Sequence, residues 1–288
     1  MRGKSIDMKA LFKLMGIFVL MMVVGNGIQL GAGFALINAG ITVPFIVYSI
    51  LLYVPMIAIA ILYTSNQGEA FWKACGFKKI KAGTVFLAIL LTVVFYPMVM
   101  FANVFSQLFT QNTVVQGADA IIGDSPVLYI ISIALLAPVC EEILLRGFFH
   151  NRMKKLIPFT AAAILSGFWF GVLHLNLNQF CYAWLSGIIF AYVNRASGSI
   201  LTSMIMHFIM NLFGSVAIYL ETIFYKNQGK NFAEVAENMR ADSNHMMLML
   251  AVTGVLAIAS FFLTRLIIKA IAKSEGNDYR EIQEDAVA

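Results

Sequence analysis

Charged residues are scarce in this chain of 288 amino acids. Asp, Glu, Lys and Arg together make up 12% of it, whereas a soluble domain has about 25%. The composition is 60% hydrophobic and the mean hydropathy is +0.82. So few polar side chains cannot cover the surface of a water-soluble particle of this size. The scarcity of charge therefore indicates a protein that is embedded in a membrane.

Cysteine is also rare, and the three cysteines are scattered along the chain at Cys75, Cys140 and Cys181. There is no Cys-x-x-Cys and no spacing typical of a metal site, so we expect no disulfide framework. The formal net charge of +5 does not require a nucleic-acid partner. Lys and Arg lie beside apolar runs, as they do in the cytoplasmic loops of membrane proteins.

Long stretches without charge predict the fold. No Asp, Glu, Lys or Arg lies between Lys13 and Glu69. The apolar runs are continuous and do not alternate with period two, which favours helices over a β-barrel. Most approach or exceed the roughly 20 residues that a bilayer requires. We therefore expect an all-α polytopic bundle of about eight transmembrane helices, at residues 13–35, 41–64, 83–108, 126–155, 158–174, 178–194, 198–219 and 245–271.

The basic residues predict the orientation of this bundle. They cluster at the N-terminus, in the loops after the second, fourth and sixth helices, and at the end of the eighth helix, while the first, third and fifth loops carry no Lys or Arg. Both termini are therefore expected in the cytoplasm, in an integral protein of the plasma membrane. We expect one transmembrane domain over 1–273 and a polar, disordered cytoplasmic tail over 274–288. The first apolar run lacks a signal-peptide cleavage site and is interpreted as a membrane helix.

Two adjacent glutamates, Glu141 and Glu142, interrupt an apolar run. A carboxylate inside a bilayer costs at least about 2.5–3.5 kcal/mol, so an intramembrane ionisable residue is a functional hypothesis by default. Glu142 and Arg146 lie four residues apart on one helical face, where a salt bridge lowers this cost. Glu141 is rotated by about 100° from its neighbour. Two close carboxylates in a low dielectric do not easily both ionise, which suits one of them to general-base chemistry.

Two later helices carry histidines at a similar depth. Phe170 and His174 share one face of the fifth predicted helix, and His207 and Asn211 share one face of the seventh. Counted from the turn after the fourth helix, Glu141 and His174 lie roughly 21 and 24 Å along their helices at about 1.5 Å per residue. His207 and Asn211 are somewhat shallower. Polar residues from three helices are therefore expected to meet inside the bundle.

Each of these residues also has a purely structural interpretation. A Glu–Arg pair, a histidine and an asparagine in membrane helices commonly hold helices together. Cys140 next to His174 suggests a thiol nucleophile, but a buried cysteine is more often an inert small side chain. His150 and His245 lie near helix ends and are interpreted as incidental, and the charges of 234–242 as a solvated face.

Taken together, the three motifs are far more specific. Glu-Glu-x-x-x-Arg (Glu141, Glu142, Arg146), Phe-x-x-x-His (Phe170 to His174) and His-x-x-x-Asn (His207 to Asn211) occur in this order. The chain resembles the CPBP family, the CAAX proteases and bacteriocin-processing enzymes that are also called the ABI family. The resemblance covers about residues 125–215. It implies a membrane-embedded endopeptidase with its catalytic core at about 125–215.

The resemblance also implies roles for individual residues. Glu141 would be the general base and His174 would hold the attacking water. His207 and Asn211 would donate to the oxyanion, and Glu142 and Arg146 would support the site. The choice between the two glutamates rests on the resemblance alone.

Two histidines and a glutamate are also zinc-type ligands, so Glu141, His174 and His207 are the candidates if a metal binds. The cofactor is therefore either none or a divalent metal such as Zn²⁺. There is no His-Glu-x-x-His, and Asn211 is a poor zinc ligand. We favour water activation without a metal.

Three functions compete at this point. The first is an intramembrane endopeptidase acting on a membrane-associated protein or peptide, such as a CAAX-type protein or a bacteriocin or pheromone precursor. The second is a non-catalytic membrane immunity or binding protein of the same fold. The third, a transporter with a proton-coupled carboxylate, lacks the expected inverted repeat. Peptide-bond cleavage that depends on Glu141 separates the first from the other two. The expected partners are the peptide substrate and the lipid bilayer, with no nucleic acid.

Overall fold

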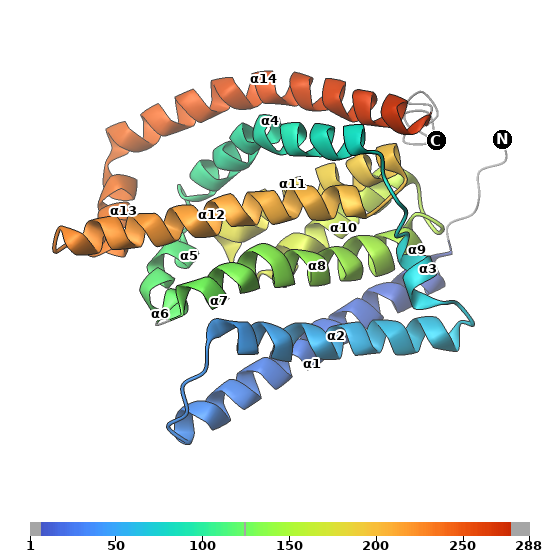
Figure 1. Ribbon diagram of the computed structural model, residues 1–288, viewed down its shortest axis with the longest axis horizontal. Helices are drawn as coiled ribbons and strands as arrows, with labels where there is room; N and C mark the ends of the chain where they lie inside the picture. The colour runs from blue at the N-terminus through green and yellow to red at the C-terminus, as the bar shows by residue number, and fades with distance from the viewer. Residues whose placement is uncertain (1–6, 124, 278–288) are drawn as a thin grey trace.

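The computed structural model describes residues 7–123 and 125–277, and within these ranges every regular element is a helix (Figure 1). The all-α prediction is confirmed. The eight long helical segments expected from the sequence are α1 (Met8–Asn38), α2 (Phe45–Asn66), α4 (Ala82–Ser106), a composite helix over 126–153, α10 (Phe159–Leu173), α11 (Leu177–Ser197), α12 (Leu201–Asn227) and α14 (Ser243–Glu275). Short helices connect them at α3 (Phe71–Cys75), α5 (Thr113–Gln116), α6 (Ala118–Ile122) and α13 (Phe232–Ala241).

Six helices of the described chain are long and apolar enough to cross a membrane. They are α1, α2, α4, the composite helix, α12 and α14. The number of eight is therefore approximate. α10 has only 15 residues, and α11 carries polar residues such as Asn178, Asn194 and Arg195 that lower its hydropathy. The apolar helices identify the chain as an integral membrane protein.

Several helix ends differ from the predicted ones. α12 continues to Asn227, eight residues beyond its predicted end, because backbone hydrogen bonds continue through the polar residues Glu221 and Lys226 where a hydropathy pattern stops. α14 ends at Glu275, where Gly276 adopts a left-handed conformation with φ of 82°, so the first residues of the expected tail are still helical. Residues 278–288 of that tail and the basic residues Arg2 and Lys4 lie outside the described residues.

The composite helix is the least regular element. It consists of α7 (Pro126–Ile131), the π-helix η1 (Ser132–Leu136), α8 (Ala137–Glu142), the π-helix η2 (Ile143–His150) and α9 (Asn151–Met153). π-helical segments are rare and occur frequently at functional sites. Every residue of η2 is buried. The two glutamates therefore lie at the junction between a short α-helix and a buried π-helix.

The helices are arranged in layers around this element. α14 packs on α4 at one side of the molecule, and the α1–α2 hairpin lies at the opposite side (Figure 1). The composite helix lies between them, and its segment α8 contacts α12 on one side and α2 on the other. α10 contacts η2. The residues of the candidate site thus come from the composite helix and from helices that adjoin it, α2, α10 and α12.

α10 and α11 approach each other closely through glycines. A Cβ atom added at Gly187 would lie 2.5 Å from the Cα atom of Gly167, and one at Gly167 would lie 2.8 Å from the carbonyl oxygen of Trp184. Small residues of this kind allow membrane helices to pack backbone to backbone. This contact sets the distance between α11 and the helix that carries His174.

We expect Gly167→Ala to lower the melting temperature in detergent, because overpacking a close contact costs about 1–3 kcal/mol. Gly16→Ala on α1 is the matched control, since its Cβ would meet no atom within 4 Å and alanine favours a helix over glycine by up to about 1 kcal/mol. Equal melting temperatures for the two variants would contradict the close-packing interpretation.

Candidate active site

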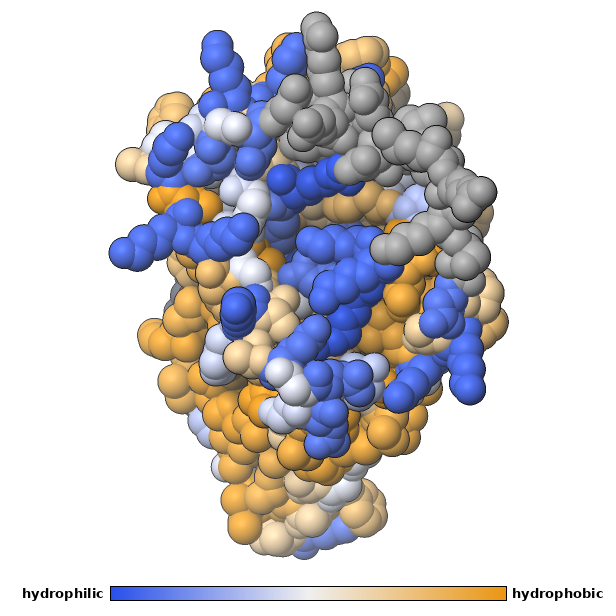
Figure 2. Space-filling model, turned by 90° about the vertical axis from the view of Figure 1, so that its right-hand side faces the viewer, coloured by the Kyte–Doolittle hydropathy of each residue, from blue (hydrophilic) through white to orange (hydrophobic). Residues whose placement is uncertain are grey.

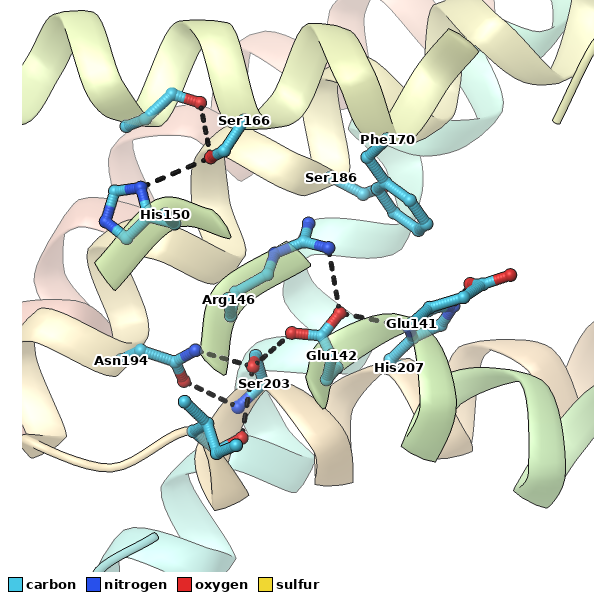
Figure 3. Close-up of polar contacts among 12 residues, drawn as sticks. Glu141, Glu142, Arg146, His150, Ser166, Phe170, Ser186, Asn194, Ser203 and His207 are labelled. Carbon is cyan, nitrogen blue, oxygen red and sulfur yellow. Dashed lines mark hydrogen bonds and ion pairs between the residues drawn. The ribbon is translucent and has the colours of Figure 1, made fainter. Parts of the chain in front are cut away.

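Glu141 and Glu142 are both buried at the end of α8, with exposed fractions of 5% and 0%. Although adjacent, they accept hydrogen bonds from different residues, and Figure 3 shows the contacts of Glu142. Glu142 pairs with Arg146 at 3.0 Å and accepts a hydrogen bond of 2.5 Å from the Ser203 hydroxyl. Glu141 accepts a hydrogen bond of 2.5 Å from the Tyr53 hydroxyl. One carboxylate is thus neutralised by a full positive charge, and the other is held by a neutral donor.

The guanidinium of Arg146 is buried and is stabilised by Glu142 and by two aromatic rings. Its side chain is 1% exposed, and its guanidinium lies 4.4 Å from the ring centre of Phe170 and 5.1 Å from that of Phe190. Aromatic faces attract a cation through their quadrupole, most strongly where water is excluded. A Cβ at Gly187 would lie 3.1 Å from Nη2, so the glycine makes room for the group. Nε and Nη2 have no hydrogen-bond partner among residues 7–123 and 125–277, so the ion pair and the two rings carry most of the stabilisation.

His207 lies between the two glutamates and is 4% exposed. Its Nδ1 is 3.2 Å from Oε1 of Glu142, and its Nε2 is 3.6 Å from Oε2 of Glu141. An ionised carboxylate only accepts hydrogen bonds, so Nδ1 is the donor towards Glu142. The ring packs against Phe170 and Phe190 at centroid distances of 5.4 and 5.3 Å. His207 therefore connects the two carboxylates directly.

His174 lies at the C-terminal cap of α10 and is half-buried. Its Nδ1 is 2.8 Å from the carbonyl oxygen of Phe170. Because a carbonyl oxygen only accepts, Nδ1 carries the proton and Nε2 is the basic nitrogen. The next residue, Leu175, has a φ of 49°, which is uncommon for a residue other than glycine. This turn ends α10 directly after His174.

Phe170 connects the two histidines. Its ring lies 5.0 Å from the ring of His174 and 5.4 Å from that of His207. In the described part of the chain, His174 makes no hydrogen bond or ion pair with Glu141 or His207. The structure therefore gathers both histidines around one aromatic ring, while only His207 reaches the glutamates. The role of His174 stays a prediction.

Asn211 connects α12 to the first π-helix, η1. Its Nδ2 donates a hydrogen bond of 3.0 Å to the carbonyl oxygen of Ile133. The amide of Ala137 donates to Ser132, and Pro138 has no N–H to donate. The carbonyl of Ile133 thus loses both of its usual helical donors, and Asn211 replaces them. One hydrogen of the Asn211 amide group is used in this way, and the second has no acceptor among residues 7–123 and 125–277.

Tyr53 and Ser203 were not found from the sequence. Ser203 lies four residues before His207, and the shared helical face was a usable signal. Tyr53 offered no such signal, because it lies in the uncharged segment between Lys13 and Glu69 together with other aromatic residues. Only the packing of α2 against α8 brings it to Glu141.

Three other sequence interpretations can be compared with the structure. His150 lies near the end of the composite helix, as expected, but it is buried, with Nδ1 3.3 Å from the Ser166 hydroxyl and its ring against Phe159. Cys140 is buried and shares no hydrogen bond or ion pair with His174 among the described residues. The thiol nucleophile therefore gains no geometric support. α13, which contains most of the charged segment 234–242, has no buried residue.

A metal ion does not fit the three residues that the sequence offered for one. Among residues 7–123 and 125–277, no three His, Cys, Asp or Glu side chains are placed to hold a metal together. One carboxylate of the cluster, Glu142, is already paired with Arg146. Glu141, His174 and His207 thus do not form a metal site, and no chemical step is assigned to a metal.

We expect Arg146→Ala to lower the folded yield and the melting temperature sharply. Removing one partner of a buried ion pair costs about 3–5 kcal/mol, because the other charge stays buried and uncompensated. Arg240→Ala is the matched control, since its pair with Glu237 lies at the surface with exposed fractions of 27% and 32%, where such pairs contribute little. Unchanged thermal stability of Arg146→Ala in detergent would count against the buried pair.

Comparison with known proteins agrees with the motif resemblance. Residues 123–213 match the family model of Rce1-like proteins, described as type II CAAX prenyl endopeptidases. No curated protein and no solved structure matches the chain. The matched residues contain all three motifs, the composite helix, α10, α11 and the first part of α12. Helices α1, α2, α4 and α14 lie outside them. The segment that carries the buried glutamate pair is therefore similar to Rce1-like proteins, which are described as type II CAAX prenyl endopeptidases and belong to the CPBP family.

Proposed function

We propose that this protein is an intramembrane endopeptidase that hydrolyses a peptide bond of a membrane-associated protein or peptide. The observation that carries the proposal is the difference between the adjacent carboxylates. Arg146 neutralises Glu142 at 3.0 Å. Glu141 has the neutral donor Tyr53 and the His207 ring, and no Lys or Arg pairs with it among the described residues. Glu141 therefore keeps the capacity to accept a proton.

In the proposed reaction Glu141 takes a proton from a water molecule as its oxygen attacks the scissile carbonyl carbon. The basic Nε2 of His174, oriented by the hydrogen bond from Nδ1 to Phe170, accepts the second hydrogen bond of that water. When the tetrahedral intermediate collapses, the C–N bond breaks and the proton on Glu141 passes to the leaving amine. General-base catalysis of this kind contributes about 10²–10⁴-fold.

The oxyanion requires donors that are already in place. Asn211 offers the second hydrogen of its amide group while the first holds the carbonyl of Ile133. His207 offers Nε2, which donates only when both ring nitrogens carry hydrogen, since Nδ1 already donates to Glu142. Both residues lie on α12, about one helical turn apart. They therefore move as one rigid unit.

The proposed substrates are CAAX-type prenylated proteins, bacteriocin precursors or pheromone precursors. Such substrates are held at or in the bilayer, and a buried site between apolar helices is reached from there. The match to Rce1-like proteins supports a CAAX-type substrate. A non-catalytic immunity or binding protein of the same fold is the alternative, and a cleavage assay separates the two.

We expect Glu141→Gln and His174→Ala to reduce cleavage by at least about 100-fold while the protein still accumulates. The measurement maps the N- and C-termini of proteins in the membranes of cells that carry each variant at equal level. It is made with and without a metal chelator. Glu221→Gln, an exposed glutamate on α12, is the control and should cleave normally. New termini that persist in Glu141→Gln would overturn the catalytic assignment, and identical termini in all cells would favour the immunity protein.

We also propose that the end of the bundle with α3 and α9 faces the cytoplasm, in the plasma membrane. Hydrophilic side chains gather over this end, and orange apolar surface covers the flanks below it (Figure 2). The loops here carry basic residues, among them Lys78, Lys79, Lys154 and Lys155, and cytoplasmic loops are enriched in Lys and Arg.

The orientation is tested with two exposed lysines at opposite ends, Lys79 and Lys230. In intact cells a membrane-impermeant maleimide should label Lys230→Cys and should reach Lys79→Cys only after permeabilisation. The unsubstituted chain reports any background from its three cysteines. The opposite labelling pattern would reverse the orientation.

A further inference from the structure

Tyr53 reaches the site from outside the segment that matches the Rce1-like family. It lies on α2, whereas the match begins at residue 123. Its hydroxyl oxygen is 2.5 Å from Oε1 of Glu141, and the two side chains are 6% and 5% exposed. A hydroxyl that donates to a carboxylate at this distance forms a charge-assisted hydrogen bond, roughly twice as strong as a neutral one.

A second polar contact holds α2 in the same place. Ser49 lies one turn before Tyr53, and its hydroxyl is 2.7 Å from the hydroxyl of Ser132 in η1. Both serines are buried. α2 is therefore attached to the composite helix at Ser49 and Tyr53, and further along at Thr64, which accepts a hydrogen bond of 2.9 Å from Arg152. Only the contact of Tyr53 touches a residue of the proposed reaction. This makes it possible to separate the attachment of the helix from an effect on Glu141.

The hydrogen bond from Tyr53 determines how the Glu141 carboxylate is turned. The last side-chain torsion angle of glutamate has a broad distribution, so a carboxylate without a hydrogen-bond partner rotates freely. With Oε1 held by Tyr53, Oε2 is the oxygen on the side of His207, 3.6 Å from Nε2. Oε2 is then the atom that accepts the proton of the attacking water.

We propose that Tyr53 is a positioning residue that orients Glu141 as the general base, supplied by a helix outside the Rce1-like segment. This inference rests on the proposed function. It also gives a physical reason why Glu141 rather than Glu142 is the base. A neutral hydroxyl orients a carboxylate and leaves its negative charge available, whereas the Arg146 guanidinium cancels the charge of Glu142.

The test compares Tyr53→Phe with two variants that also remove one hydroxyl from α2. Tyr63→Phe removes a hydroxyl that makes no hydrogen bond among the described residues, from a ring that packs against Phe148 and Arg152. Ser49→Ala removes the attachment of α2 that lies one turn before Tyr53, without touching Glu141. Each protein is purified in detergent, its melting temperature is recorded, and kcat and KM are measured on a synthetic peptide that spans the most abundant cleavage site found by terminal mapping.

For Tyr53→Phe we expect kcat to fall by about tenfold or more, the size of effect that loss of one hydrogen bond to a charged group produces. KM should stay within about twofold, because the phenol does not contact the substrate in this proposal. Tyr63→Phe and Ser49→Ala should keep the wild-type kcat, even if Ser49→Ala melts earlier.

Three outcomes would overturn the inference. Wild-type kcat in Tyr53→Phe would show that the hydrogen bond does not act through Glu141. An equal loss of kcat in Ser49→Ala, or failure of Tyr53→Phe to fold, would show that Tyr53 only anchors α2. Glu141→Gln is run alongside: full activity in that variant rejects the proposed function itself, whereas an inactive Glu141→Gln with an active Tyr53→Phe rejects the role of Tyr53 alone.

Discussion

The buried charge of Glu142 is the constraint on which the rest of this structure depends. A carboxylate with no exposed surface requires a compensating charge, and Arg146 supplies it from the same helix at 3.0 Å. The guanidinium in turn needs the rings of Phe170 and Phe190 and the space at Gly187. These residues come from α10 and α11, so one ion pair determines how three helices pack around the site.

The same ion pair allows Glu141 to take a different role from Glu142. With Glu142 neutralised, His207 can bridge to Glu141, and the two adjacent carboxylates take different roles. The π-helix η1 contributes in a related way, because Pro138 and the shifted hydrogen bond of Ala137 release the carbonyl of Ile133 to Asn211. Departures from regular helix geometry thus bring α12 to the composite helix. The site is built from residues that also hold the bundle together, so catalytic and structural effects of mutations have to be separated by matched controls.

Much of the fold could be predicted because a helix that spans a bilayer requires a long run of apolar residues, which is visible in the sequence. Long apolar runs located the long helices approximately, although the fourth and eighth also carry charged residues. Counting residues from a turn predicted that Glu141 and His174 lie at similar depth, with His207 somewhat shallower. Helix ends were less predictable: α12 extends past Glu221 because backbone hydrogen bonding does not depend on apolar side chains. The shared helical faces of Glu142 with Arg146 and of His207 with Asn211 followed from spacing alone, since residues four apart in a helix are neighbours.

The sequence by itself determined a helical membrane protein, the pairing of Glu142 with Arg146, and a set of motifs typical of one protease family, because these depend on local spacing and on the cost of burying charge. The tertiary structure alone decided which hydroxyl donor each glutamate receives. Tyr53 and Ser203 come from helices far away in sequence, 88 and 61 residues from their carboxylates, and contacts of that kind depend on how helices pack rather than on any pattern along the chain. It also decided that His174 meets the site through Phe170 rather than by direct contact with Glu141.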